Sequence, residues 1–330
     1  MNIGKIPNDL LEKLLNKNIG KRRPEILIGP GIGKDCGVID FGDDVCVIST
    51  DPITGAVNKI GYLAIHISCN DVATTGAKPI GAMVTIIAPV NTQYEEIENI
   101  MKDVNLAANE LDLEIIGGHT EITPAVNQVV ISVTALGKIA KKELVHPGKA
   151  QIGDDILVTK KAGLEGTAII AMDRRDILAK YFSQDFIDRS SKFIEEISVV
   201  KEGLLASEFG AHAMHDVTEG GILGALWEMS KAMNKGLVVD IDKIPIAQET
   251  REICKIFHID PLRLISSGSM IIVAPEGEKL SRELSKIGIL ATIIGKVVEG
   301  NTPIVFQNGE KSVLDQPVSD ELYKAINYSE

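Results

Sequence analysis

The chain has 330 residues, of which 45% are hydrophobic and 24% are charged, and its 46 acidic and 34 basic side chains give a formal net charge of −12. This length favours two domains, and the apolar fraction excludes a mainly disordered chain. The acidic balance and an aromatic content of only 4% argue against a protein whose main partner is a nucleic acid.

The sequence also limits the expected compartment. No apolar run approaches the ~20 residues of a membrane span, so we expect no membrane segment. The first residues, 1–7, contain no signal-peptide core. No pair of cysteines has CxxC spacing, which argues against a zinc site and against a disulfide framework. We therefore expect a protein of the reduced cytoplasm. The cysteines are Cys36, Cys46, Cys69 and Cys254.

The first predicted elements are a helix, a strand and a glycine loop. Leucines at helical spacing predict a helix over 10–15 that stops at Gly20, and 25–28 is typical of a short strand. The loop over 29–35 is not a P-loop, because Asp35 stands where that motif needs Ser or Thr. It is not a dinucleotide-binding fingerprint either, because its glycines are spaced GxGxG and a strand follows.

A β-hairpin is predicted over 36–50, with its turn at 41–44. Asp35 and Asp51 flank its two arms. Because the open ends of an antiparallel hairpin lie side by side, these carboxylates should be neighbours. Two close carboxylates repel each other and call for a cation between them. The alternative is a pair of solvated aspartates at the strand ends.

A helix is predicted over 58–77, and it ends near Gly76. Asp71 falls on its apolar face. An ionised carboxylate is costly there unless it is paired or binds a metal ion. The alternative is a solvent-exposed aspartate at the helix end.

The rest of the first half alternates strands with a helix. A buried strand is expected over 80–88, and a capping box over 92–95 opens a helix that runs to Leu111. A strand over 113–116 comes next, and one over 128–136 closes this half.

The strand over 113–116 runs into a Gly-Gly motif. We expect a turn at Gly117-Gly118-His119-Thr120-Glu121, whose backbone N–H groups could cradle an anion beside two titratable side chains. A plain tight turn is the alternative.

A composition shift at 146–149 predicts a domain boundary, with one domain over 1–148 and a second over 149–330. Helices are expected from about 163, across 173–209 and from about 220. Strands and helices do not alternate strictly, so the predicted class is α+β. The strands predicted in the second half span 155–159, 212–216, 237–241, 270–274 and 291–297.

Asp216 ends one of these strands, just before the glycine-rich entrance of a helix at Gly220. It is open to two interpretations. Asp216 could cap the helix, or it could face a cleft between the two halves.

Five segments share an ordered pattern: Gly33–Val38, Ser49–Asp51, Ser68–Pro79, Gly117–Glu121 and Met214–Gly221. Their residues and spacing resemble the aminoimidazole-ribonucleotide synthetase superfamily. Its members also include formylglycinamidine synthetase, selenophosphate synthetase, thiamine-monophosphate kinase and the hydrogenase maturation E protein. The resemblance extends through nearly the whole chain.

The resemblance implies a two-domain α+β, PurM-like fold. The N-terminal half would dimerise through β-hairpins into a shared barrel-like core, and ATP with Mg²⁺ would lie between the domains near the dimer interface. The implied chemistry is phosphorylation of an amide- or carbonyl-type oxygen, which then leaves as phosphate. The implied metal ligands are Asp35, Asp51 and Asp71. The implied nucleotide-binding residues are Gly33, Lys34, Asn70, Gly117, Gly118 and Thr120, and the implied catalytic residues are Asp216, His119 and Glu121.

Within the superfamily, the chain looks most like the hydrogenase maturation E protein. That protein carries a carbamoyl group on a C-terminal cysteine, whereas the last cysteine here is Cys254. A thiamine-monophosphate kinase or another small-molecule phosphotransferase is one alternative, and a nucleotide- or metabolite-binding protein without turnover is another. Expected partners are a small-molecule substrate or a group carried by a partner protein, and a second copy of the chain. The second copy is expected because the hairpin over 36–50 and the strand over 80–88 leave sheet edges that a small domain does not cover. Neither nucleic acid nor membrane is expected.

Overall fold

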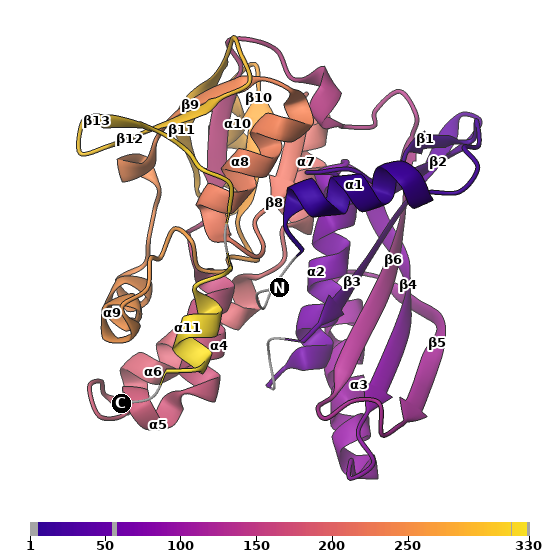
Figure 1. The fold of residues 1–330 in the computed structure, drawn as a ribbon, viewed down its shortest axis with the longest axis vertical. Coiled ribbons are helices and arrows are strands. Elements are labelled where there is room, and N and C mark those ends of the chain that lie inside the picture. The colour runs from indigo at the N-terminus through magenta and orange to yellow at the C-terminus, as the bar shows by residue number, and fades with distance from the viewer. Residues whose placement is uncertain (1–5, 55–57, 318, 329–330) are drawn as a thin grey trace.

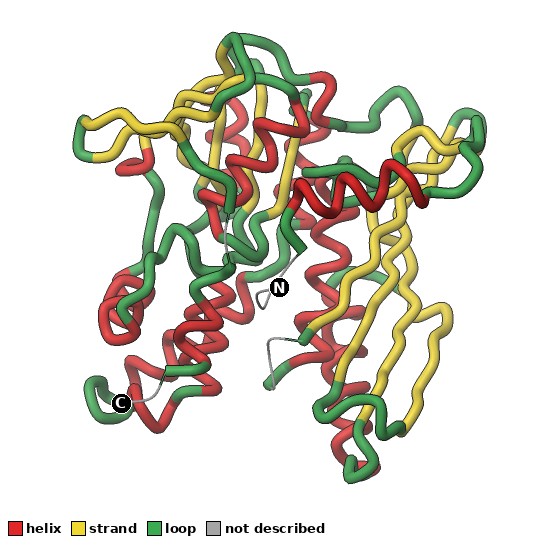
Figure 2. Tube along the Cα trace, in the orientation of Figure 1, coloured by secondary structure: helices red, strands yellow, loops and turns green. Residues whose placement is uncertain are grey.

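Two β-sheets organise the chain, with helices between them and a separate group of helices formed by α4, α5, α6, α9 and α11 (Figure 1). The computed structural model describes residues 6–54, 58–317 and 319–328. The tube in Figure 2 shows one sheet for each half of the chain, and helices of both halves meet between them. This mixed architecture confirms the α+β prediction.

The first sheet has six strands in the order β1-β2-β3-β6-β4-β5. All pairs are antiparallel except β4 with β5. The hairpin predicted over 36–50 is confirmed as β2 and β3. The strand bounds are β1 (Ile26–Ile28), β2 (Gly37–Phe41), β3 (Asp44–Ile53), β4 (Lys78–Ala88), β5 (Glu114–Ile122) and β6 (Val130–Ala140).

One face of this sheet is covered by α2 (Ile60–Thr74), against which α3 (Tyr94–Glu110) packs. Every residue of α2 is buried, although the spacing predicted only one apolar face. The capping box of α3 lies one residue later than predicted. The backbone N–H of Thr92 donates to the Pro89 carbonyl in a preceding turn, so that Gln93 becomes the cap and its N–H donates to Glu96.

The Gly-Gly motif is not a turn, so this expectation was wrong. Residues 117–121 continue straight through β5, which pairs with β4. A Cβ on Gly118, whose φ is +152°, would lie 1.9 Å from the carbonyl oxygen of Val84. Glycine is therefore needed for the close approach of two strands and not for a reversal of the chain.

The second sheet has seven strands in the order β13-β12-β9-β11-β7-β10-β8. Its β12–β13 hairpin was not predicted from the sequence. The strand bounds are β7 (Asp155–Thr159), β8 (Ala213–Asp216), β9 (Gly236–Asp240), β10 (Met270–Ala274), β11 (Ala291–Val298), β12 (Pro303–Gln307) and β13 (Glu310–Val313).

The remaining helices lie at the N-terminus and in the second half of the chain (Figure 1). Among the described residues, no helix is long and apolar enough to span a membrane. The bounds are α1 (Asn8–Asn18), α4 (Leu164–Asp173), α5 (Arg175–Leu178), α6 (Gln184–Ser191), α7 (Val200–Glu208), α8 (Gly221–Met233), α9 (Gln248–Phe257), α10 (Gly277–Lys286) and α11 (Leu322–Ile326), with 3₁₀ turns at η1 (Pro147–Lys149), η2 (Lys192–Glu196) and η3 (Ile241–Lys243).

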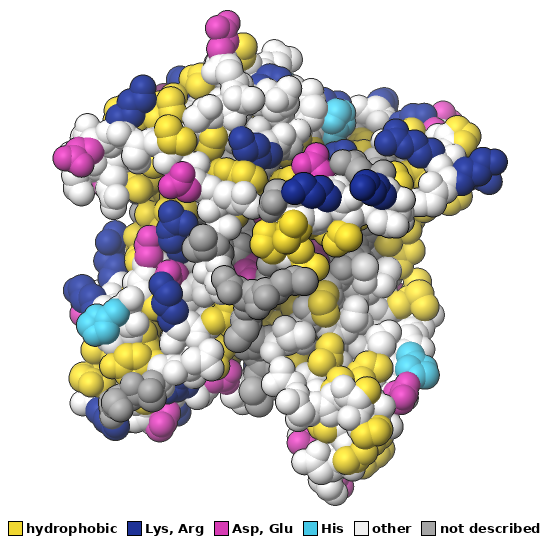
Figure 3. Space-filling view, in the orientation of Figure 1, with side chains coloured by type: hydrophobic (Ala, Val, Ile, Leu, Met, Phe, Trp, Pro, Cys, Tyr) yellow, Lys and Arg dark blue, Asp and Glu magenta, His cyan; other side chains and the backbone are white. Residues whose placement is uncertain are grey.

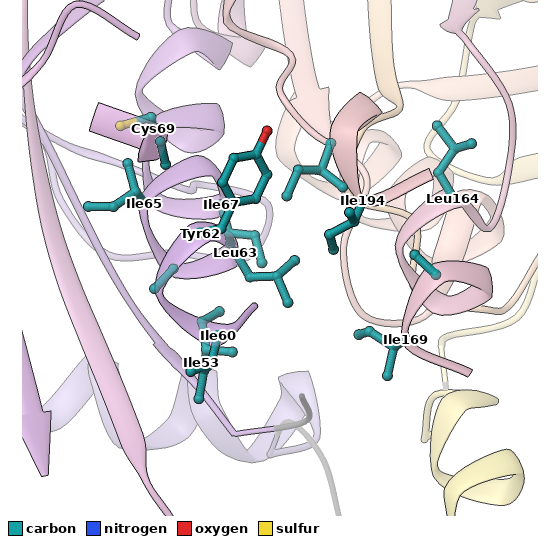
Figure 4. Packing of buried hydrophobic residues seen from close by; sticks show 14 of the residues in the cluster. Ile53, Ile60, Tyr62, Leu63, Ile65, Ile67, Cys69, Leu164, Ile169 and Ile194 are labelled. Carbon is teal, nitrogen blue, oxygen red and sulfur yellow. The ribbon is translucent and has the colours of Figure 1, made fainter. Parts of the chain in front are cut away.

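The largest hydrophobic cluster joins the two halves of the chain. Leu63 and Ile67 of α2 belong to the same cluster as Leu164 and Ile169 of α4 and Ile194 of η2, and Figure 4 shows these side chains converging. The division at residue 148 stays a prediction, although the first sheet ends at Ala140 and the second begins with β7.

Candidate active site

A cavity of about 350 Å³ lies between the end of the β2–β3 hairpin, α2 and the second half of the chain. Its described lining contains seven carboxylates but only one lysine, Lys34. Such an excess of negative charge in one cavity calls for a cation. The acidic lining residues are Asp35, Asp51, Asp71, Glu165, Glu219, Glu228 and Asp320.

The three predicted metal ligands meet in this cavity. Asp35 precedes β2, Asp51 lies in β3, and Asp71 reaches them from the buried helix α2. The Ser49 hydroxyl lies within hydrogen-bonding distance of the Asp71 carboxylate and of the Asp35 carbonyl, which holds the hairpin against the helix. The hairpin argument and the helical spacing therefore both predicted the position of these side chains.

The pKa of Asp71 reflects its burial and the other carboxylates around it. Burial, and then the charges of Asp216 and Asp51, raise the pKa of Asp71 well above its usual range. Each ionised carboxylate in this cluster makes ionisation of its neighbours less favourable. Without a cation, the cluster therefore holds protons to higher pH than isolated aspartates do.

Asp216 joins this cluster from the second half of the chain. It is 1% exposed, and its Oδ2 has no hydrogen-bond partner among the described residues. Burial, followed by the charge of Asp35, raises the pKa of Asp216 to about 7. The helix-cap interpretation was wrong, because Asp320 accepts the N–H of the cap residue Gly220 at 2.6 Å.

His215 supplies an internal positive charge. Its Nδ1 lies 2.8 Å from Asp35 and its Nε2 lies 3.1 Å from Glu228. Burial alone would lower the pKa of His215, but Asp35 and Glu228 outweigh that effect and hold the pKa well above its usual value. Asp35, His215 and Asp216 lie close enough to share a metal ion. A histidine that donates from both nitrogens has no lone pair for a cation, so we assign the ligand role to the carboxylates.

Four acidic groups of the cavity were not predicted from the sequence: Glu165, Glu219, Glu228 and Asp320. Burial raises the pKa of Glu165 to about 7, although the N–H of Ser267 donates to its carboxylate. Burial also raises the pKa of Asp320 to about 6. Glu165 lies in the apolar stretch that forms α4, and this is the same signal that identified Asp71. Asp320 lies in irregular chain near the C-terminus, where no pattern identifies it.

The predicted nucleotide-binding residues divide into three groups. Gly33 and Lys34 line the cavity. Gly117, Gly118 and Thr120, together with His119 and Glu121, lie on the exposed strand β5 and do not line it. His119 Nε2 is 3.3 Å from Glu121 on the same strand. The structure of one chain thus does not bring this pair to the aspartates.

Asn70 is fully buried and joins the two halves of the chain. Its Nδ2 donates to the carbonyl of Ile197, and its Oδ1 accepts the N–H of Val199, both at 2.8 Å. Both ends of the amide are therefore used within the protein, and the side chain positions α2 instead of contacting a ligand.

We expect Asn70→Ala to lower the free energy of unfolding by about 1–3 kcal/mol, because two buried backbone groups lose their partners. Denaturant unfolding of both proteins measures this change. Asn301→Ala, at an exposed position, is the control and should leave the midpoint unchanged. Equal midpoints for Asn70→Ala and the wild type would contradict the bridging role.

Two family models match the chain. The model described as "AIR synthase related protein, N-terminal domain" matches residues 33–139, and the corresponding C-terminal domain model matches residues 151–307. Together they include every carboxylate of the cavity except Asp320.

Three relatives are similar along most of their length. A hydrogenase expression/formation protein of Methanocaldococcus jannaschii is 29% identical, over 97% of this chain and 96% of its own length. The carbamoyl dehydratase HypE of Bradyrhizobium diazoefficiens is 28% identical, over 74% of this chain and 71% of its own length. The thiamine-monophosphate kinase of Pyrococcus horikoshii is 26% identical, over 82% of this chain and 84% of its own length.

Solved structures share the fold. HypE in a HypE–HypF complex aligns with a TM-score of 0.75 at 22% identity, covering 93% of this chain and 99% of that one. The hydrogenase maturation protein HypE in complex with ATP aligns with a TM-score of 0.71 at 22% identity, covering 94% and 91%. These likenesses confirm the predicted PurM-like two-domain fold.

Proposed function

Because the chain belongs to the family of AIR synthase related proteins, we propose that it transfers the γ-phosphoryl group of Mg²⁺-ATP to an acceptor in the acidic cavity. The observation that carries this proposal is the convergence of Asp35, Asp51, Asp71 and Asp216, from both halves of the chain, on one buried cluster. Such a cluster is unfavourable alone and suited to divalent cations.

The relatives support the ATP-dependent part of the proposal. HypE has been solved in complex with ATP, and one relative is named a kinase. HypE has also been solved in complex with HypF. The acceptor in this protein is therefore either a free small molecule or a group that a partner protein carries, and we propose an amide- or carbonyl-type oxygen as the atom that receives the phosphoryl group.

In this proposal Asp35, Asp51, Asp71 and Asp216 hold magnesium, and Gly33 and Lys34 approach the phosphates. Bound Mg²⁺ would neutralise phosphate charge as it develops in the transition state. A side chain on Gly33 would collide with α8, where its Cβ would lie 2.7 Å from the Glu228 carbonyl oxygen. The glycine thus keeps this loop close to the cavity.

We assign the removal of a proton from the acceptor to Glu165. During transfer, the acceptor oxygen bonds to the γ-phosphorus while the bond between that phosphorus and the bridging oxygen breaks and releases ADP. A carboxylate whose pKa is raised to about 7 by burial is suited to take up a proton from the acceptor at neutral pH.

Binding of Mg²⁺-ATP is the first test. We expect isothermal titration to show binding with magnesium and at least a tenfold loss of affinity with a chelator, because triphosphate cannot approach seven carboxylates without a bridging cation. A screen for ADP release over pooled metabolites then tests turnover. Equal affinity with and without magnesium would contradict the proposed site.

We also propose that the protein is a homodimer built on the uncovered face of the first sheet. The sequence prediction placed free edges at the hairpin and at 80–88, and this was wrong, because the edges are β1 and β5. Support comes instead from large apolar side chains on β4 and β5 that are about half exposed on this face: Ile80, Met83 and Ile116. An apolar face of this kind is typical of an interface. His119 and Glu121 would reach a nucleotide only from such a partner.

We expect light scattering at micromolar concentration to give twice the chain mass, and Met83→Glu to give a monomer, because a charge is buried at the centre of the interface. Met101→Glu is the control. Met101 is 40% exposed and Met83 is 47% exposed, but Met101 lies on α3, away from this face. A monomeric wild type would contradict the dimer.

A further inference from the structure

A second cavity, of about 490 Å³, has the opposite charge to the acidic one. Three lysines and a histidine line it, and no carboxylate is among its described lining residues. This is unusual for a chain with a net charge of −12. The basic lining residues are Lys34, Lys141, His146 and Lys149, and we call this space the basic cavity.

Its positive groups converge and are only partly neutralised. Lys141 pairs with Asp40, and Lys149 donates to the Leu144 carbonyl, which leaves its charge uncompensated. The side chain of Lys34 has no hydrogen bond or ion pair with any residue that the structure describes. Burial, followed by the charges of Lys149 and Lys34, lowers the pKa of His146. The electrostatic influence of both lysines therefore reaches this ring.

The basic cavity and the acidic cavity share a wall. Lys34 lines both of them. The preceding residue, Gly33, packs against α8 between Glu228, which lines the acidic cavity, and Ala232, which lines the basic one. These two residues are four apart on a helix, or about 6 Å along its axis. A small molecule in the basic cavity therefore lies near the edge of the aspartate cluster.

The surroundings favour an anion as well. On the face shown in Figure 3, Lys and Arg side chains gather at the end of the molecule that carries α1 and β1. The exposed run Lys21-Arg22-Arg23 joins these two elements, with Arg23 paired to Glu25, and β1 contributes Ile28 to the basic cavity. A positive rim of this kind raises the local concentration of anionic ligands.

We propose that the basic cavity binds the acidic group, a carboxylate or a phosphate, of a small molecule while the nucleotide occupies the acidic cavity. That this molecule is the phosphoryl acceptor rests on the proposed function. Lysines bind either group as point charges, and the apolar lining at Leu27, Ile28 and Leu144 would cover its carbon skeleton.

The test uses the full chain, with inorganic phosphate and acetate as probes in parallel titrations at constant ionic strength. We expect one of the two to bind, to raise the pKa of His146 measured by NMR, and to bind about tenfold more weakly to Lys149→Gln. Which probe binds identifies the source of the acidic group. Lys149→Arg keeps the charge and should retain binding. Lys142→Gln is the matched control, because the neighbouring Lys142 is exposed and does not line the cavity.

The titrations are then repeated with saturating Mg²⁺ and a non-hydrolysable ATP analogue, and binding should persist. Competition would mean that the probe occupies the nucleotide's own site, and it would overturn the inference. The inference would also be overturned if neither probe bound, or if Lys149→Gln and Lys142→Gln lost equal affinity for the probe. If the analogue did not bind, the proposed function would be contradicted. The first titrations, made without nucleotide, would still show whether the basic cavity binds an anion.

Discussion

Asp216→Asn should remain folded and lose about a hundred- to a thousandfold in the rate of phosphoryl transfer. The substitution keeps the shape of the side chain but removes one of four carboxylates from a buried cluster. A charge contact made at the transition state has an effect of about this size. The fold should not suffer, because Asp320 and not Asp216 caps α8. The measurements are ADP release with an acceptor found in the metabolite screen, and the melting temperature.

Asp154→Asn is the matched control for this variant. Asp154 is also a buried aspartate, 4% exposed, but it pairs with His212 and does not belong to the aspartate cluster. We expect its rate of ADP release to stay within about twofold of the wild type. If folded Asp216→Asn protein released ADP at the wild-type rate, Asp216 would have no part in the reaction.

Asp71→Asn should have opposite effects on stability and on ligand binding. Burial and like charges raise the pKa of Asp71 far above the usual 3.8. Its contribution to stability is therefore fully present below about pH 4 and is lost as the pH rises through the elevated pKa. At pH 8 without ligand, we expect the asparagine variant to be about 1–3 kcal/mol more stable than the wild type, and the difference should vanish near pH 4.

The same substitution should remove most of the stabilisation that Mg²⁺-ATP gives to the wild type, because a metal ligand is lost. Thermal melts at several pH values, with and without Mg²⁺-ATP, measure both effects. Asp112→Asn makes the same change in net charge on the surface, where the carboxylate pairs with Lys78, and should give no stabilisation. A variant that is less stable than the wild type at pH 8 would show that repulsion does not dominate the cluster.

The parts of the site that local patterns specify were predictable. Asp71 stood out because the helical period places it among apolar residues, and Asp35 and Asp51 because a hairpin brings its ends together. Their partners were not predictable in this way. His215 meets Asp35 across 180 positions of sequence, and no spacing rule links two such segments. The basic cavity combines residues of the glycine loop, of the 141–149 segment and of α8, and only the fold brings them together.

The Gly117-Gly118 motif shows how a correct residue signal can lead to the wrong structure. Paired glycines are typical of turns, and this led to the expectation of an anion cradle. In the structure, Gly118 instead makes room for the backbone at Val84, so that β5 can pair with β4. Sequence alone cannot separate these two uses of glycine, because the contact that requires it comes from another strand. The catalytic role of His119 and Glu121, which lie on the same strand, stays a prediction.

The hydrophobic cluster that joins α2 to α4 and η2 has a consequence for how the protein unfolds. Leu63 and Ile67 are buried by residues more than ninety positions away, so that separating the halves would expose the same side chains that stabilise each of them. The two sheets should therefore melt in one cooperative transition, and the amide protons of α2 should exchange with solvent only when the whole chain opens. The aspartates that this helix and the hairpin present are thus held in place by the global stability of the protein.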